Sequence, residues 1–199
     1  MRKPGLLLLS ILLVIGVAGC GGTPASSTSA PADTPVPDEP ALPALSQSVT
    51  SSDGVTVSYP DGWKDPIATV GVFLFNNADG EATLNFLRSR PGGLAFQINL
   101  QPGTTVPTAT ELFDFSFNTL ASGIGITLGE KQTFTLGDAE IIKATGANTD
   151  AASQIGMYVA LKPVSQGYVT FAVFLAPDEI EAQTPLIEAI LASVTYSAP

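Results

Sequence analysis

Few side chains in this sequence could do chemistry. The chain has one cysteine, Cys20, and no histidine. Histidine is the commonest general base and a common metal ligand, so its absence removes the usual partner of a catalytic serine. Neither a Gly-x-Ser-x-Gly nor a Ser-x-x-Lys motif occurs. A pair of carboxylates could still act as acid and base, but Glu111 and Asp114 are explained by a helix cap and an exposed helix face. We therefore expect that the protein is not an enzyme.

Two further patterns are weak matches to known ligand sites. The run Asn77-x-Asp79-Gly80-Glu81 resembles part of a calcium loop, but Phe75 and Phe86 would occupy its first and twelfth positions, where acids are required. A turn between strands explains this run better. Gly123-x-Gly125 lacks the third glycine of a dinucleotide loop and follows a predicted helix, not a strand. We expect no metal and no cofactor.

Three residues are candidates for contact with a ligand or partner. Arg88 and Arg90 alternate, which places both on one face at the end of a predicted strand. They could clamp an anionic group, or they could simply solvate a sheet edge. Phe115 lies between Phe113 and Phe117, which share the apolar face of a predicted helix, so Phe115 must point elsewhere. It either lies under a neighbouring loop or is exposed at a partner surface.

The N-terminus has the organisation of an export signal. A basic start precedes an apolar segment at 6–17, which is shorter than the roughly 20 residues that a membrane-spanning helix needs. At its end the segment leads into the run Val17-Ala18-Gly19-Cys20, which resembles the lipobox of bacterial lipoproteins. This resemblance implies that 1–19 are a signal peptide and that Cys20 carries diacylglyceryl and palmitate groups. An ordinary signal peptide with a chance cysteine is the alternative.

Acyl chains on Cys20 would serve as the membrane anchor. Each buried CH₂ contributes about 0.8 kcal/mol, so two or three chains hold a protein on a bilayer firmly. We expect a protein of the cell envelope, on the extracytoplasmic face of the membrane. Whether the host has one membrane or two does not follow from the sequence.

A tether is predicted between the anchor and the folded part of the chain. Residues 20–48 are rich in proline, serine and alanine and contain no aromatic residue. Such a segment cannot bury enough apolar surface to offset its ordering entropy, and its prolines favour an extended chain. A proline-motif ligand for a partner protein is the alternative.

Residues 49–199 have the patterns of one folded domain. Strands are predicted first at 55–59, 70–75, 82–87 and 94–100, and a capping box, Thr108-x-x-Glu111, then opens a helix. Four more strands are predicted at 132–136, 139–144, 156–161 and 168–175, before a last helix that begins at Pro177 and that Pro185 should split. Because no regular helical crossovers separate the strands, we expect an α+β fold with a mostly antiparallel sheet and packed helices.

Both ends of this domain resemble those of the PsbP-like family. The resemblance is carried by the segment from Val55 to Trp63, with its Tyr59-Pro60 and Gly62-Trp63 pairs, and by the final segment 185–194 with its Ser-Val exit. It implies an antiparallel sheet with packed helices and a non-catalytic accessory or binding role. The best-known members assist the oxygen-evolving complex of photosystem II, but this chain lacks the histidines and the basic surface of that role.

The net charge and the predicted location in the cell envelope together favour a binding protein. The formal net charge of −10 repels nucleic acid and anionic headgroups, so we expect no nucleic acid partner. Our main hypothesis is a lipid-anchored, non-catalytic binding or assembly module, with an envelope protein as a possible partner. The alternative is a solute-capturing lipoprotein associated with a transporter. A deep apolar pocket would favour the alternative, whereas an open face with an exposed aromatic residue would favour the main hypothesis.

Overall fold

The computed structural model describes residues 42–69, 72–77, 91–102, 108–150 and 154–198. These residues belong to one compact unit, Pro40–Pro199. A large sheet has the strand order β3-β4-β5-β10-β9-β8-β6, with β7 paired to β8 as well. Its strands are β3 (Ile67–Thr69), β4 (Val72–Asn76), β5 (Ala95–Pro102), β6 (Thr127–Leu128), β7 (Gln132–Leu136), β8 (Ala139–Asn148), β9 (Ile155–Val164) and β10 (Gly167–Leu175).

A small sheet lies beside the large one and joins the two ends of the domain. It consists of β1 (Gln47–Thr50), β2 (Val55–Tyr59) and β11 (Thr195–Tyr196), in the order β1-β2-β11. Every strand pairing among the described residues is antiparallel. The expected α+β class with a mostly antiparallel sheet is therefore confirmed.

The strand pattern is more detailed than the sequence predicts. Strands β1, β3, β6 and β11 were not expected, and each has only two to four residues. A segment this short shows too little alternation to be distinguished from a turn. Gln47 and Ser48, which the sequence patterns assign to the tether, begin β1. The strand predicted at 82–87 lies outside the described residues.

Helix α2 (Ala109–Gly123) begins and ends where the sequence predicts. The Thr108 hydroxyl accepts a hydrogen bond from the backbone N–H of Glu111 at 3.1 Å and donates one to the Glu111 carboxylate at 2.9 Å. At the other end Gly125 has a φ of +72°, and the N–H of Ile126 donates to the carbonyl of Ala121 at 2.8 Å. This is the glycine-terminated ending that closes many helices.

The last helix contradicts one expectation. The short 3₁₀ helix η1 (Pro177–Glu179) leads directly into α3 (Ile180–Ser193), and Pro185 lies inside α3 without splitting it. The Thr184 hydroxyl donates to the carbonyl of Ile180 at 2.7 Å, one turn earlier. Beyond Thr184, four apolar residues of α3 are buried against the sheet. The free energy of this burial offsets the loss of the backbone hydrogen bond that proline cannot make. The four residues are Leu186, Ile187, Ile190 and Leu191.

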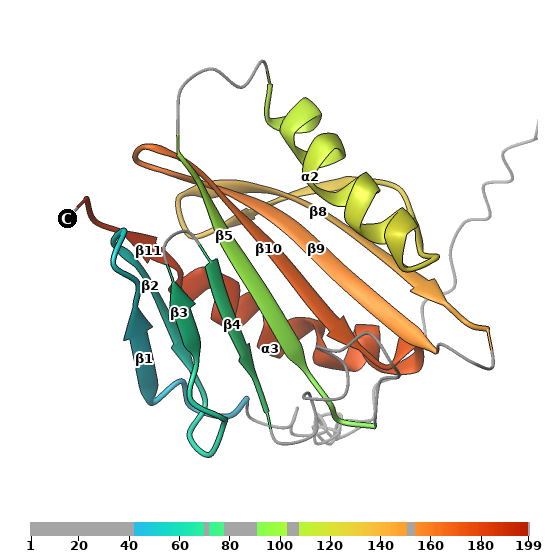
Figure 1. The fold of residues 1–199 in the computed structure, drawn as a ribbon, viewed down its shortest axis with the longest axis horizontal. Helices are drawn as coiled ribbons and strands as arrows, with labels where there is room; N and C mark the ends of the chain where they lie inside the picture. The colour runs from blue at the N-terminus through green and yellow to red at the C-terminus, as the bar shows by residue number, and fades with distance from the viewer. Residues whose placement is uncertain (1–41, 70–71, 78–90, 103–107, 151–153, 199) are drawn as a thin grey trace, which may run out of the picture. The chain divides into compact units, whose positions relative to one another are not determined.

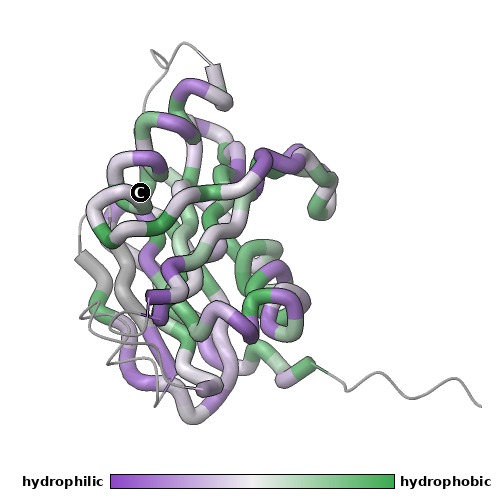
Figure 2. The backbone as a smooth tube through the Cα atoms, turned by 90° about the vertical axis from the view of Figure 1, so that its right-hand side faces the viewer, coloured by the Kyte–Doolittle hydropathy of each residue, from purple (hydrophilic) through white to green (hydrophobic). Residues whose placement is uncertain are grey.

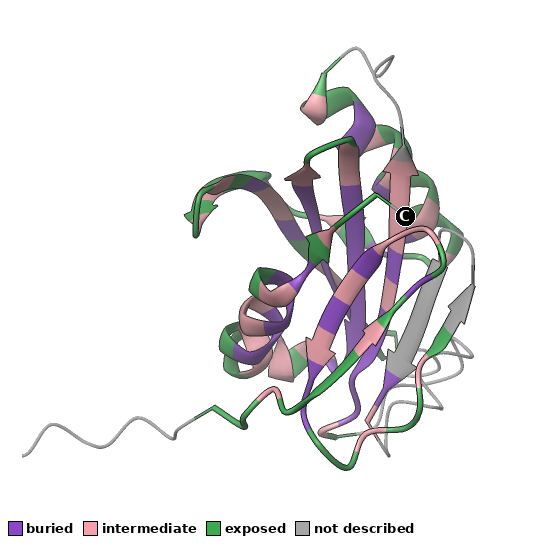
Figure 3. Cartoon of the chain, turned by 90° about the vertical axis from the view of Figure 1, so that its left-hand side faces the viewer, coloured by how far each residue is buried: buried purple, intermediate pink, exposed green. Residues whose placement is uncertain are grey.

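The large sheet has a helix on each face (Figure 1). Helix α3 and the small sheet cover one face, where the larger hydrophobic cluster includes Val57, Phe96, Phe171 and Ile187. Helix α2 covers part of the other face, where Phe113 and Phe117 pack with strand residues such as Val159. Hydropathy alternates along the strands and helices (Figure 2), and buried residues concentrate in the central strands and on the inner sides of the helices (Figure 3). Both faces therefore contribute to the hydrophobic core.

The α3 face is closed by polar contacts as well as by apolar packing. Lys162 of β9 is only 9% exposed, and its ammonium donates to the carbonyls of Leu191, Ala192 and Val194 at 2.9, 3.0 and 2.7 Å. Burial lowers the pKa of Lys162. The last carbonyls of a helix lack partners within the helix, so Lys162 caps the C-terminal end of α3 from the sheet.

Candidate functional site

Phe115 is the one sequence-predicted contact residue that the described part of the chain contains, and it is exposed. Its neighbours Phe113 and Phe117 are buried as predicted, with ring centroids 4.8 Å apart. Phe115 is 81% exposed, the largest value among the described large hydrophobic residues. Of the two positions that the sequence allowed, the exposed one is therefore correct. An exposed phenylalanine ring offers a large apolar contact surface to a ligand or partner.

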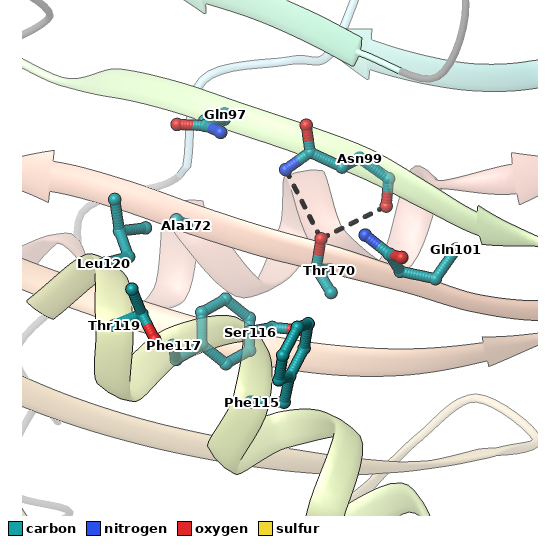
Figure 4. A pocket seen from close by; sticks show the side chains of 10 residues that line it. All are labelled: Gln97, Asn99, Gln101, Phe115, Ser116, Phe117, Thr119, Leu120, Thr170 and Ala172. Atoms are coloured by element: carbon teal, nitrogen blue, oxygen red, sulfur yellow. Dashed lines mark hydrogen bonds between the residues drawn. The ribbon is translucent and has the colours of Figure 1, made fainter. Parts of the chain in front are cut away.

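An open groove of about 400 Å³ lies beside Phe115. Figure 4 shows α2 on one side of this groove and β5 on the other, with Thr170 of β10 between them. We call it the amide groove, because three side-chain amides of β5 line it. Its lining residues are Gln97, Asn99, Gln101, Phe115, Ser116, Phe117, Thr119, Leu120, Thr170 and Ala172.

The alternation of β5 produces the amide groove. Side chains of a strand point to opposite faces in turn, so every second residue shares a face. Phe96 and Ile98 are fully buried on the α3 face, whereas Gln97, Asn99 and Gln101 point to the α2 face and are half-buried. These three amides were not predicted from the sequence as contact residues. Their signal was present in the strict alternation of apolar and amide residues over 96–101, which indicates a strand with one incompletely covered face.

Helix α2 leaves this part of the sheet uncovered. Its buried residues pack with β8, β9 and β10, as the shared cluster with Ala144, Val159 and Phe174 shows. On β10, Ala172 and Thr170 are buried at the edge of this contact. The next strand, β5, carries amides in place of apolar residues on the same face. The groove thus marks the line where the helix stops covering the sheet.

One amide of the groove is held in place and two are not. The Thr170 hydroxyl donates to the backbone carbonyl of Asn99 at 3.2 Å and accepts from the Asn99 side-chain nitrogen at 3.4 Å. Within the described part of the chain, Gln97 and Gln101 have no hydrogen-bond partner for their side chains. Both therefore keep two donors and an acceptor available to a bound molecule.

The groove has no formal charge. Among the described residues that line it, aspartate, glutamate, lysine and arginine are all absent. This is unusual on a protein with a formal net charge of −10, whose surface repels anions in general. Any molecule that binds here is recognised by hydrogen bonds and apolar contact.

A second cavity, of about 460 Å³, lies between β8, β9 and the start of α3. Lys143 lines it, but its ammonium is already paired with the Glu188 carboxylate at 2.6 Å. The Tyr158 hydroxyl donates to the same carboxylate at 3.2 Å, and Lys143 lies 4.5 Å from the centre of the Phe134 ring. Burial, and secondly the negative charge of Glu188, raise the pKa of Tyr158 well above its ordinary value. These groups satisfy one another, so the cluster joins β8, β9 and α3.

The remaining sequence-predicted sites are placed as follows. Cys20, Arg88 and Arg90 lie outside the described residues, as do Asp79, Gly80 and Glu81 of the calcium-like run. Asn77 is described, and its side chain bridges the carbonyl of Gly92 at 2.6 Å and the N–H of Leu94 at 3.0 Å. Asn77 thus joins two chain segments within the fold, which agrees with its interpretation as a turn residue.

The described residues contain neither a cluster of metal ligands nor a membrane-spanning helix. No group of three or more acidic, histidine or cysteine side chains is arranged there to hold a metal ion. No helix in this part of the chain is long and apolar enough to cross a bilayer.

A solved structure has a fold similar to that of this chain. The solution structure of PsbP from the cyanobacterium Synechocystis sp. PCC 6803 is similar over 76% of this chain and 92% of its own, with a TM-score of 0.52 and 16% sequence identity. At this identity the likeness shows the fold alone, and it confirms the PsbP-like architecture that the two ends of the domain predicted. No family model and no curated protein sequence matches this chain.

Two weaker similarities add nothing to this argument. A protein of Bacteroides thetaiotaomicron VPI-5482 aligns over 77% of this chain but only 49% of its own, with a TM-score of 0.48 and 12% identity. A Pseudomonas aeruginosa protein of unknown function aligns over 72% and 92%, with a TM-score of 0.44 and 9% identity.

Proposed function

We propose that this protein is a non-catalytic binding module, held on the extracytoplasmic face of the membrane by acyl chains on Cys20, and that it binds through the amide groove. The observation that carries the binding role is the exposed ring of Phe115 beside the half-buried amides of Gln97 and Gln101, which have no hydrogen-bond partner among the described residues. The absence of histidine from the whole sequence supports a role without catalysis. The PsbP-like fold is compatible with this role but does not establish it, because one fold hosts many functions.

The alternative of solute capture for a transporter has less support. A small solute is usually enclosed by a pocket with mostly apolar walls. The amide groove is open and about half of its lining is polar, and the second cavity is bordered by the charged residues Glu130, Asp178 and Glu181. Neither matches the deep apolar pocket that would favour the transporter hypothesis.

The anchor is tested at Cys20. Cys20→Ala should abolish metabolic labelling with radioactive palmitate and leave the unprocessed precursor, because no other cysteine is available for acylation. Cys20→Ser provides a second, smaller change with the same expected result. Full labelling of either variant would refute the lipoprotein assignment.

The groove is tested by binding to isolated cell envelopes. The mature chain, residues 20–199 with Cys20→Ser, carries no acyl group and should bind saturably to envelopes of the cells that produce it. Phe115→Ser should weaken this binding about tenfold, which corresponds to a loss of about 1.4 kcal/mol. The matched control is Asn118→Ser, an exposed position of α2 that does not line the groove. Equal binding by the two variants would exclude Phe115 from the site.

A further inference from the structure

The amide groove selects a class of ligand, and this inference rests on the proposed function. Its lining offers amide donors and acceptors, three hydroxyls and an exposed aromatic ring, with no ionisable side chain among the described residues. Such a lining gives a charged ligand no counter-charge, while the acidic protein around it repels anions. A neutral ligand that carries many hydrogen-bonding groups and an apolar face fits this lining best.

The amides are arranged to meet an extended array of small polar groups. Residues on one face of a strand repeat every two positions, about 6.6–6.8 Å apart along the strand. Gln97, Asn99 and Gln101 follow this repeat on β5. Thr170 holds the Asn99 nitrogen, whereas the Asn99 side-chain oxygen and the amides of Gln97 and Gln101 have no hydrogen-bond partner among the described residues. Half-buried amides of this kind gain free energy when a ligand supplies the missing hydrogen bonds.

A protein segment is a poor match for the groove. Peptides that add to a sheet need an unpaired strand edge, but β5 pairs with β10 over Ala95–Pro102 and with β4 over Ala95–Asn99, which leaves at most three residues of edge among the described residues. Helical peptides need a continuous apolar groove, and acidic peptides need an arginine cluster, and the lining has neither. Proline-rich peptides need several aromatic rings, whereas Phe115 is the only exposed one in the lining.

We infer that the amide groove binds a neutral saccharide, with one sugar ring stacked on Phe115. A sugar ring carries hydroxyl groups around its rim and C–H groups on its faces. The C–H face of one ring fits against the exposed ring of Phe115, while hydroxyls along the saccharide exchange hydrogen bonds with Gln97, Asn99 and Gln101. Figure 4 shows Phe115 on the helix side of the groove and the amides on the side of β5, so a ligand in the groove lies between the two.

The test uses chemically treated envelopes as the probe for the mature chain with Cys20→Ser. Periodate cleaves the vicinal diols of sugars, whereas a protease digests exposed protein. Saturable binding should become at least about tenfold weaker after periodate treatment and should survive protease treatment. Raising the salt concentration from about 0.05 M to 0.5 M should change the affinity less than twofold, because no charge lines the groove.

Variants of the groove separate stacking from general apolar contact. Phe115→Trp should bind as well as the original chain, whereas Phe115→Leu should bind about tenfold less, because leucine has no ring face. Gln101→Met keeps the size of the side chain but removes its hydrogen bonds, and it should also weaken binding. Asn118→Ser again serves as the control, and far-ultraviolet circular dichroism checks that each variant is folded.

The outcomes distinguish the two proposals. Binding that is sensitive to protease but resistant to periodate would overturn the saccharide and leave a binding module for a protein. Equal binding by Phe115→Leu and Phe115→Trp would overturn ring stacking in the same way. Absence of any saturable envelope binding would refute the proposed function itself, and the saccharide with it.

Discussion

The two faces of the large sheet are closed to very different degrees. On the α3 face, apolar side chains from both sheets and from α3 form one continuous cluster, and Lys162 bonds the final carbonyls of the helix. On the α2 face, the helix covers β8 to β10, and β5 presents amides to an open groove. On the first face the buried ammonium of Lys162 is fully engaged with carbonyls, whereas the second leaves the amides of Gln97 and Gln101 and the ring of Phe115 exposed to a groove. The α3 face is therefore the more completely covered of the two, and the proposed binding surface lies on the α2 face.

The largest expected effect comes from Trp63, next to the small sheet on the α3 side. Its ring centroid lies 5.3 Å from that of the fully buried Phe96, and it packs against the larger core cluster. Trp63→Ala should lower the free energy of unfolding by about 3 kcal/mol, measured by urea denaturation. As the only tryptophan, Trp63 also reports on itself. Its emission should shift to longer wavelength on unfolding, and a native emission that is already red-shifted would contradict this structural role.

A smaller loss is expected at Lys162. Lys162→Met keeps most of the side-chain volume but leaves three carbonyls at the end of α3 without their donor. We expect a loss of about 2 kcal/mol, since an unsatisfied buried polar group costs about 1–3 kcal/mol. The matched control is Lys131→Met, which removes an exposed ion pair with Asp114 at 2.8 Å and should cost less than about 1 kcal/mol. Equal losses in the two variants would show that Lys162 does not secure α3.

Tyr158 makes the α3 face sensitive to high pH. Because burial raises its pKa, the folded state keeps the phenolic proton at a pH where the unfolded state, with an ordinary value of 10.0, has released it. The stability from this group is complete below about pH 10 and declines above it, by up to about 1.4 kcal/mol per pH unit. Lys162 acts in the opposite direction, because its lowered pKa makes the unfolded state bind more protons.

A comparison of variants isolates the tyrosine. The free energy of unfolding should fall less steeply from pH 10 to 11 in Tyr158→Phe than in the original chain, because phenylalanine has no proton to lose. Absorbance at 295 nm provides an independent measurement. Tyr158 should ionise only as the protein unfolds, and ionisation of all four tyrosines before unfolding would contradict its burial.

The smallest expected effect on stability is at Phe115. A surface substitution usually changes stability by less than about 0.5 kcal/mol, and Phe115 is 81% exposed. Phe115→Ser should therefore unfold at nearly the same urea concentration as the original chain while it loses binding. Phe117→Ser, two residues further along the same helix, should be strongly destabilised because Phe117 is 2% exposed. A similar loss in both variants would remove the contrast between the two faces.

The sequence alone determined the class of the fold and its principal elements. Alternation predicted β2, and the strands predicted at 132–136 and 168–175 correspond to β7 and β10. The capping box at Thr108 predicted the start of α2, because this signal is local and the structure keeps it. The sequence motifs at the two ends of the domain also predicted the PsbP-like architecture. The lipobox-like run at Cys20 and the two arginines remain predictions, because they lie outside the described residues.

Only the tertiary structure decided which side chains meet and which remain open. Pro185 broke a local rule, but burial of α3 against the sheet outweighed it. Lys162 reads as an ordinary surface lysine in the sequence, yet it caps a helix about 30 residues further along the chain. Phe115 and the amides of β5 line one groove because α2 does not cover this part of β5. Such contacts depend on where separate elements end against one another, and the period of a single strand or helix does not contain that information.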